Sequence, residues 1–155
     1  MNHNTIGTII LDCAVELHRD LGPGLLEAVY EVALARALAR RGLRVRRQVG
    51  ITFEYQGDRF DEGFRADLVV EDMVLVELKS VEHLAPVHKK QLLTYLKISG
   101  LRLGYLLNFG ELLLRDGITR IIHGNLSADP KDRPDGSRFE NELSRRHGEH
   151  GEPKL

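Results

Sequence analysis

The first forty residues alternate between apolar and polar side chains with the period of an α-helix. Between residues 5 and 20 the apolar side chains recur three and four positions apart, as on one face of a helix. Gly22-Pro23-Gly24 ends this segment. A second helix is expected from about Leu25 to Arg41, just before Gly42. Its apolar residues surround most of its circumference, so we expect it to be largely buried.

From residue 43 the pattern changes to a period of two, which is typical of β-strands. A further helix interrupts the strands: Pro86 suits its first turn, the helix runs to about Ser99, and Gly100 ends it. A turn is expected at residues 56–58. The strands are expected at residues 43–56, 60–70, 73–80, 103–109 and 118–123.

This order of elements predicts an α/β fold in which a mixed sheet is flanked by helices. Beyond Gly124 the composition changes, because residues 125–155 are rich in charge and carry few large apolar side chains. Such a segment cannot bury enough surface to order itself alone. We therefore expect one domain over residues 1–124 and a polar, flexible tail over 125–155, in which Phe139 and Leu143 are candidates for docking or for a short helix.

Composition limits the classes of protein that fit this chain. The 155 residues suit one domain, and the formal net charge of -1 does not by itself indicate a nucleic-acid binder. Cys13 is the single cysteine, which excludes an internal disulfide and fits a reducing compartment. No apolar run reaches the roughly 20 residues of a membrane span, and the N-terminus does not resemble a secretory signal. We expect a soluble, cytoplasmic protein.

Two neighbouring strands carry charged residues inside otherwise apolar runs. Glu77 and Lys79 are two positions apart, so they point to the same side of their strand. Whether Asp67 joins them depends on the loop between the strands. A two-residue loop places Asp67 opposite Val76, on the wrong face. A three-residue loop, residues 71–73, places Asp67 opposite Glu77, with Cβ atoms about 5 Å apart.

Two ionised carboxylates at that separation repel each other unless a proton or a cation lies between them. A hard divalent cation, Mg²⁺ or Mn²⁺, suits oxygen ligands of this kind. Lys79 beside them would hold a water molecule or stabilise negative charge on a phosphate. The alternative from spacing alone is an internal salt-bridge ladder in which Lys79 neutralises Glu77, and the spacing leaves both readings open.

The same residues resemble the motifs of a known family. Asp67 followed by Glu77-Leu78-Lys79 resembles the signature of the PD-(D/E)XK nuclease superfamily, with Ala66 where that signature nominally has proline. Residues 24–30, GLLEAVY, look like the hallmark of its GxxExxY branch. Gln91 to Tyr95 is similar to the QxxxY motif of the exonuclease-like branches. The resemblance covers residues 5–123.

This resemblance implies a restriction-endonuclease-like α-β-β-β-α-β core, preceded here by an extra N-terminal helix. It also implies a metal site in which Asp67 and Glu77 bind Mg²⁺ or Mn²⁺. The Leu78 carbonyl would add a ligand, and Glu27 would assist directly or through water. Lys79 would position or activate the attacking water. The implied catalytic set is therefore Glu27, Asp67, Glu77, Lys79, Gln91 and Tyr95.

Some of these residues also have a plain structural interpretation. Glu27 is equally suited to the first turn of its helix, where an acid favours the helix dipole. Gln91 and Tyr95, one helical turn apart, would brace the site or touch substrate, but ordinary packing also explains them. A cluster of arginines is either a phosphate-binding stripe or a solvated face: Arg36, Arg40, Arg41, Arg44, Arg46 and Arg47.

The resulting expectation is a metal-dependent nuclease that hydrolyses phosphodiester bonds of nucleic acid, with DNA as the expected substrate. The alternative is a catalytically silent protein of the same fold that acts as a binding module in a DNA repair or defence assembly. The neutral charge and small size favour a partner or a homodimer that supplies further nucleic-acid contacts.

Overall fold

The computed structural model describes residues 1–128. Most of the predicted tail, including Phe139 and Leu143, lies outside the described residues. The elements follow in the predicted order, with one additional short 3-10 helix, η1. They are α1 (His3–Leu21), α2 (Glu27–Arg40), β1 (Val45–Tyr55), β2 (Asp58–Val70), β3 (Val74–Lys79), α3 (Pro86–Ser99), β4 (Leu103–Asn108), η1 (Leu114–Gly117) and β5 (Ile118–Ile122).

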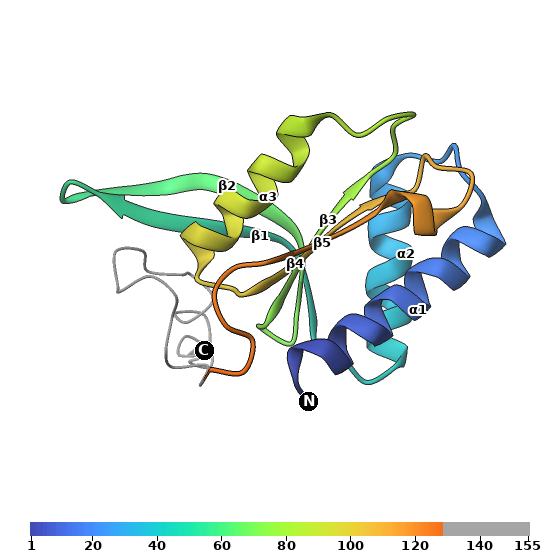
Figure 1. Cartoon of the computed structure of the whole chain (residues 1–155), viewed down its shortest axis with the longest axis horizontal. Helices are drawn as coiled ribbons and strands as arrows, with labels where there is room; N and C mark the ends of the chain where they lie inside the picture. The colour runs from blue at the N-terminus through green and yellow to red at the C-terminus, as the bar shows by residue number, and fades with distance from the viewer. Residues whose placement is uncertain (129–155) are drawn as a thin grey trace, which may run out of the picture.

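The strands form one mixed sheet in the order β1-β2-β3-β4-β5. Only β3 and β4 run parallel, because α3 crosses between them, and the other neighbouring pairs are antiparallel. In Figure 1, α1 and α2 lie together on one side of the sheet and α3 lies on the other. This arrangement confirms the predicted α/β fold, a mixed sheet flanked by helices with an additional N-terminal helix.

Each face of the sheet has its own hydrophobic core. On the α1–α2 side, buried residues of the helices such as Ile6 and Leu34 pack against Val76 and Leu78 of β3. On the α3 side, the core contains Leu92, Leu96, Leu75, Val69 and Ile51. Consecutive residues of the central strands therefore alternate between two apolar layers, as the period of two requires. A polar side chain inside such a strand has no apolar explanation.

The prediction that α2 is largely buried is wrong. Five of its residues are buried: Tyr30, Glu31, Leu34, Ala35 and Leu38. Residues 27–29 are exposed at its N-terminus, and much of its remaining circumference is alanine or arginine that faces α1 or solvent. Alanine counts as apolar in a sequence pattern but is small enough to tolerate exposure. The helix thus buries one face and leaves its first turn accessible.

The described residues contain no helix that is both long and apolar enough to cross a membrane.

Candidate active site

The loop between β2 and β3 decides where the charged residues of these strands lie. Val70 pairs with Val74, so the loop has three residues and the register is the one that places Asp67 opposite Glu77. The paired ladder ends one step earlier, at Leu68 and Val76. Beyond this step β3 continues beside β4 as far as Lys79. The two carboxyl groups therefore lie where β2 and β3 stop pairing.

Where the ladder ends, the side-chain carboxyl groups accept hydrogen bonds from backbone N–H groups of the neighbouring strand. The Asp67 backbone N–H donates to Oε1 of Glu77 at 3.1 Å, and the Leu78 backbone N–H donates to Oδ2 of Asp67 at 2.9 Å. Each side chain thus accepts from the backbone of the neighbouring strand. These contacts fix both carboxyl groups, and they leave Oδ1 of Asp67 and Oε2 of Glu77 free of these backbone bonds.

The two groups cannot both ionise freely. Burial, followed by the negative charge of Asp67, raises the pKa of Glu77 to about 9. Burial also raises the pKa of Asp67, although the hydrogen bond from the Leu78 N–H acts in the opposite direction. A side-chain hydrogen bond with Asp67 raises the pKa of Glu77 further, so Glu77 is the acid of the pair that keeps its proton more readily. The pair therefore favours a proton or a bound cation over two free negative charges.

The donor set fits Mg²⁺ or Mn²⁺, because it consists of carboxylate oxygens fixed from two strands, and hard oxygen ligands suit these ions. Within residues 1–128, however, no group of three or more His, Cys, Asp or Glu side chains gathers closely enough to hold a metal ion. A site built on Asp67 and Glu77 would thus need backbone oxygen, water or substrate oxygen to complete its coordination.

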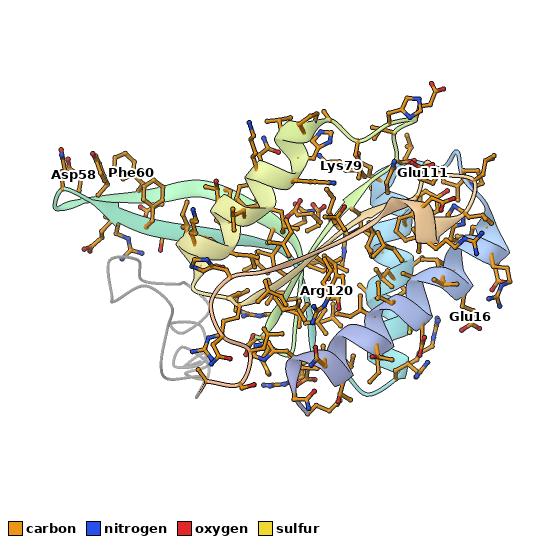
Figure 2. The ribbon with its side chains drawn as sticks, in the orientation of Figure 1. Glu16, Asp58, Phe60, Lys79, Glu111 and Arg120 are labelled. Carbon is orange, nitrogen blue, oxygen red and sulfur yellow. The ribbon has the colours of Figure 1, made fainter. Side chains whose placement is uncertain are left out.

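Lys79 follows Glu77 by two residues on β3, and its positive charge lowers the pKa of Glu77. Figure 2 labels Lys79, the last residue of β3. Its side chain is half-buried, and it forms no ion pair within 4 Å in the part of the chain that the structure describes. The salt-bridge ladder between Lys79 and Glu77 is therefore absent, and the ammonium group is available for another partner.

Glu27 is the first residue of α2 and is exposed. Its Oε1 accepts a hydrogen bond from the Ser80 backbone N–H, just beyond β3, at 3.4 Å. It lines the same hollow as Asp67, together with Leu78. The structure thus brings Glu27 to the edge of the site but not into a cluster with both other acids. Its role as a metal ligand, and that of the Leu78 carbonyl, remain predictions.

The two residues of the QxxxY motif lie on α3 and differ in their contacts. Tyr95 stacks on Phe64 of β2, with ring centroids 3.8 Å apart. Burial raises the pKa of Tyr95, and the charges of Glu77 and Asp67 raise it further, so its hydroxyl lies within electrostatic reach of the pair. Gln91 is exposed one turn earlier. Tyr95 therefore belongs to the surroundings of the site, whereas the role of Gln91 remains a prediction.

Three residues line the site that the sequence did not place there, although Arg47 was named as part of the arginine cluster. A hollow of about 370 Å³ beside Asp67 is lined by Glu31, Arg47 and Gln48 in addition to Glu27, Ala28 and Leu78. Arg47 holds Glu31 through Nε at 3.1 Å and Nη2 at 2.6 Å. The available signal for Glu31 was its place one turn after Glu27 on α2, and the available signal for Arg47 was the arginine cluster.

The arginine cluster does not form one phosphate-binding stripe. Arg44, Arg46 and Arg47 each pair with an acid, namely Glu71, Asp72 and Glu31 respectively. Three others line a separate hollow between α1 and α2: Arg36, Arg40 and Arg41. Because half of the cluster is neutralised and the other half lies away from Asp67, these residues do not make a continuous basic path to the site.

Comparison with known proteins gives one finding. The family model described as PD-(D/E)XK nuclease superfamily matches residues 4–121, which is well over half of the chain and includes every residue discussed at the site. No curated protein and no solved structure shows a significant match.

Proposed function

Since the chain belongs to the PD-(D/E)XK nuclease superfamily, we propose that it is a metal-dependent nuclease that hydrolyses phosphodiester bonds, with DNA as its substrate. The observation that carries this proposal is the contact between Asp67 and Glu77 where β2 and β3 stop pairing. Two fixed acids in one place, with an ammonium group beside them, form a costly arrangement that a purely structural strand does not need.

Asp67 and Glu77 would hold Mg²⁺ or Mn²⁺, and the Leu78 carbonyl and Glu27 would complete the ligand set directly or through water. When bound, such an ion polarises a phosphoryl oxygen and offsets the negative charge of the phosphate under attack. We also assign the chain to the GxxExxY branch. In support, Tyr30 of that motif donates a hydrogen bond to the Gly22 carbonyl and thereby anchors the segment that precedes Glu27.

The residues around Asp67 and Glu77 have separate roles in the proposed reaction. Lys79 orients the attacking water and stabilises negative charge on the phosphate, because its ammonium group has no competing ion pair within residues 1–128. The water oxygen forms a bond to phosphorus and releases a proton, the bond from phosphorus to the leaving sugar oxygen breaks, and that oxygen takes up one proton, so that one water molecule is consumed overall. Tyr95 and Gln91 border the site from α3. Exposed lysines of the same helix, Lys89, Lys90 and Lys97, supply contacts to the nucleic-acid backbone.

The test is cleavage of a panel of labelled DNAs and RNAs in the presence of Mg²⁺ or Mn²⁺. We expect the wild-type chain to cleave DNA, Asp67→Ala to be inactive, and Lys79→Ala to lose about 10²- to 10³-fold in kcat. Arg19→Ala is the control, because it removes an exposed positive charge from the last turn of α1 and leaves both the acids and the lysines of α3 untouched. Cleavage that survives Lys79→Ala unchanged would show that a contaminant or another site is responsible.

A catalytically silent binding module is the second candidate. It is favoured by the lack of a three-acid cluster within residues 1–128 and by the near-neutral charge of the chain. Titration with Mn²⁺ separates the two functions: binding that Asp67→Ala abolishes supports the nuclease, and the absence of binding supports the silent module. Gel filtration with light scattering tests the proposed homodimer.

A further inference from the structure

Gln48 has a backbone conformation that is unusual for a residue inside a strand. It lies within β1, between residues that pair with β2 on either side, yet its φ is 52°. A positive φ is sterically unfavourable for residues other than glycine. The three other non-glycine residues with positive φ in the described part of the chain lie in the turns that join β1 to β2 and β2 to β3: Gln56, Glu71 and Asp72. Those turns require this conformation, whereas a strand does not.

The strained backbone sends the Gln48 side chain toward the acids of the site. Its amide nitrogen donates to Oε1 of Glu31 on α2 and lies 3.3 Å from Oδ1 of Asp67 on β2. The backbone carbonyl oxygen of Gln48 accepts a hydrogen bond from Nη1 of Arg65 at 3.0 Å. One amide group therefore links two carboxylates from different elements that would otherwise repel each other.

The anchor of this link is rigid. The Glu31 side chain is only 6% exposed and is held by Arg47 at 2.6 Å. Asp67 accepts at Oδ2 from the Leu78 N–H, and the Gln48 amide contacts its other oxygen, Oδ1. That oxygen is the Asp67 atom left for a ligand.

We propose that Gln48 is a positioning residue for Asp67: its amide ties Oδ1 to the buried Glu31 side chain, which Arg47 holds, and keeps the carboxylate in the orientation that binds a cation. This inference rests on the proposed function in so far as Asp67 is a metal ligand. The strain at Gln48 persists because the surrounding contacts determine it, which is the pattern expected at a functional site. Glu31 acts through Gln48 and needs no contact with metal or substrate.

Two variants of Gln48 separate the amide from the backbone. Gln48→Met keeps the length of the side chain and the strain but removes the donor, whereas Gln48→Gly removes the donor and tolerates the positive φ. Gln56→Gly is the matched control, since it relieves the same backbone strain in an exposed turn away from the acids. The full-length chain is titrated with Mn²⁺ by calorimetry, and its melting temperature is measured without metal.

We expect both Gln48 variants to bind Mn²⁺ roughly 10- to 100-fold more weakly than the wild type, as is typical when a group that orients a ligand is lost. Gln56→Gly should bind like the wild type. Gln48→Gly should melt above Gln48→Met, because the two variants differ in backbone tolerance. Wild-type affinity in Gln48→Met, or in Gln48→Gly, would overturn the proposal.

A second measurement keeps the inference distinct from the proposed function. If the wild-type chain binds no Mn²⁺, the metal site fails, and crystal structures of the metal-free wild type and Gln48→Met then decide the positioning role. The Asp67 carboxylate should rotate away from Glu31 in the variant. An Asp67 side chain that keeps its orientation without the Gln48 amide would show that Gln48 does not position it.

Discussion

Glu77 imposes a cost on the folded chain that depends on pH. Its pKa is raised to about 9 by burial and by Asp67, whereas an unfolded glutamate titrates near pH 4.3. Between these values the folded state keeps a proton that the unfolded state has released. The free energy of unfolding must therefore fall as pH rises across this window, with a slope of at most about 1.4 kcal/mol per pH unit.

Glu77→Gln removes this titration while keeping the size of the side chain. In metal-free buffer we expect the variant to gain stability relative to the wild type as pH rises from 5 to 8, because glutamine cannot release the proton. Urea denaturation at both pH values measures the difference. Glu82→Gln is the control, since its side chain is 91% exposed. An advantage of Glu77→Gln that is the same at both pH values would mean that Glu77 is ionised in the folded state.

The sequence predicted part of this residue-level arrangement. The proximity of Asp67 and Glu77 was predictable because loop length determines strand register. The sequence left two loop lengths open, and the structure has the three-residue loop. The link through Gln48 could not be predicted, because it depends on a positive φ inside β1 that nothing in the local sequence requires. The role of Glu31 could not be predicted either, because the sequence does not show that Arg47 of β1 pairs with this residue of α2.

At the scale of elements, α3 approaches the sheet closely because β4 has a glycine beneath it. A Cβ atom built on Gly104 would lie 3.0 Å from Leu92 and 3.2 Å from Leu96, the two leucines that seat α3 on the sheet. The absence of a side chain at Gly104 therefore determines how closely α3 packs on the sheet. Since Tyr95 lies on the same helix, Gly104 also sets the distance between Tyr95 and the acids.

Gly104→Val should lift α3 from β4 and destabilise the fold by about 1–3 kcal/mol, the usual cost of overpacking a core. Mn²⁺ binding should persist, because the two acids lie on β2 and β3, whereas cleavage should weaken as Tyr95 moves. Chemical denaturation and Mn²⁺ calorimetry provide the two measurements. The combined loss with Leu92→Ala should be smaller than the sum of the two single losses, since the two substitutions share one space. Strictly additive losses would place the strain of Gly104→Val elsewhere.

The elements themselves were largely predictable from periodicity. The shift from a period near 3.6 to a period of two at residue 43 marks the change from α2 to β1, and Gly100 ends α3 in the left-handed conformation that favours glycine. Burial of α2 was not predictable in the same way. A helix rich in alanine has an apolar pattern on nearly every side, so the pattern cannot tell which side meets the sheet.

In the whole molecule, Asp67 and Glu77 lie at a break in the sheet, between the helices that cover its two faces. The pairing of β2 and β3 ends at Leu68 and Val76, and the gap is bordered by α2 on one side and by α3 on the other. The two separate cores hold these layers in place without filling the gap with apolar side chains. A polar cavity can therefore exist next to a rigid sheet, as a metal site requires.

The C-terminal boundary of this molecule is open to test. The sequence predicts a domain over residues 1–124. Two contacts lie beyond this boundary: Leu126 packs against the α1–α2 core, and the Ala128 carbonyl accepts a 2.7 Å hydrogen bond from the Arg102 side chain. Arg102 is buried, with only 4% of its surface exposed. Truncation after Gly124 removes these contacts, whereas truncation after Ala128 keeps them. A buried guanidinium that loses one of its acceptors is destabilising.

We therefore expect the chain ending at Gly124 to be less stable than the chain ending at Ala128 by about 1–3 kcal/mol, as measured by urea denaturation. Mn²⁺ affinity should be equal in the two chains, because the acids lie at the other end of the strands from Arg102. Equal stability would support Gly124 as the end of the domain. A loss of Mn²⁺ affinity in the shorter chain would instead mean that residues 125–128 help to hold β3 and β4 in register, since Arg102 directly precedes β4.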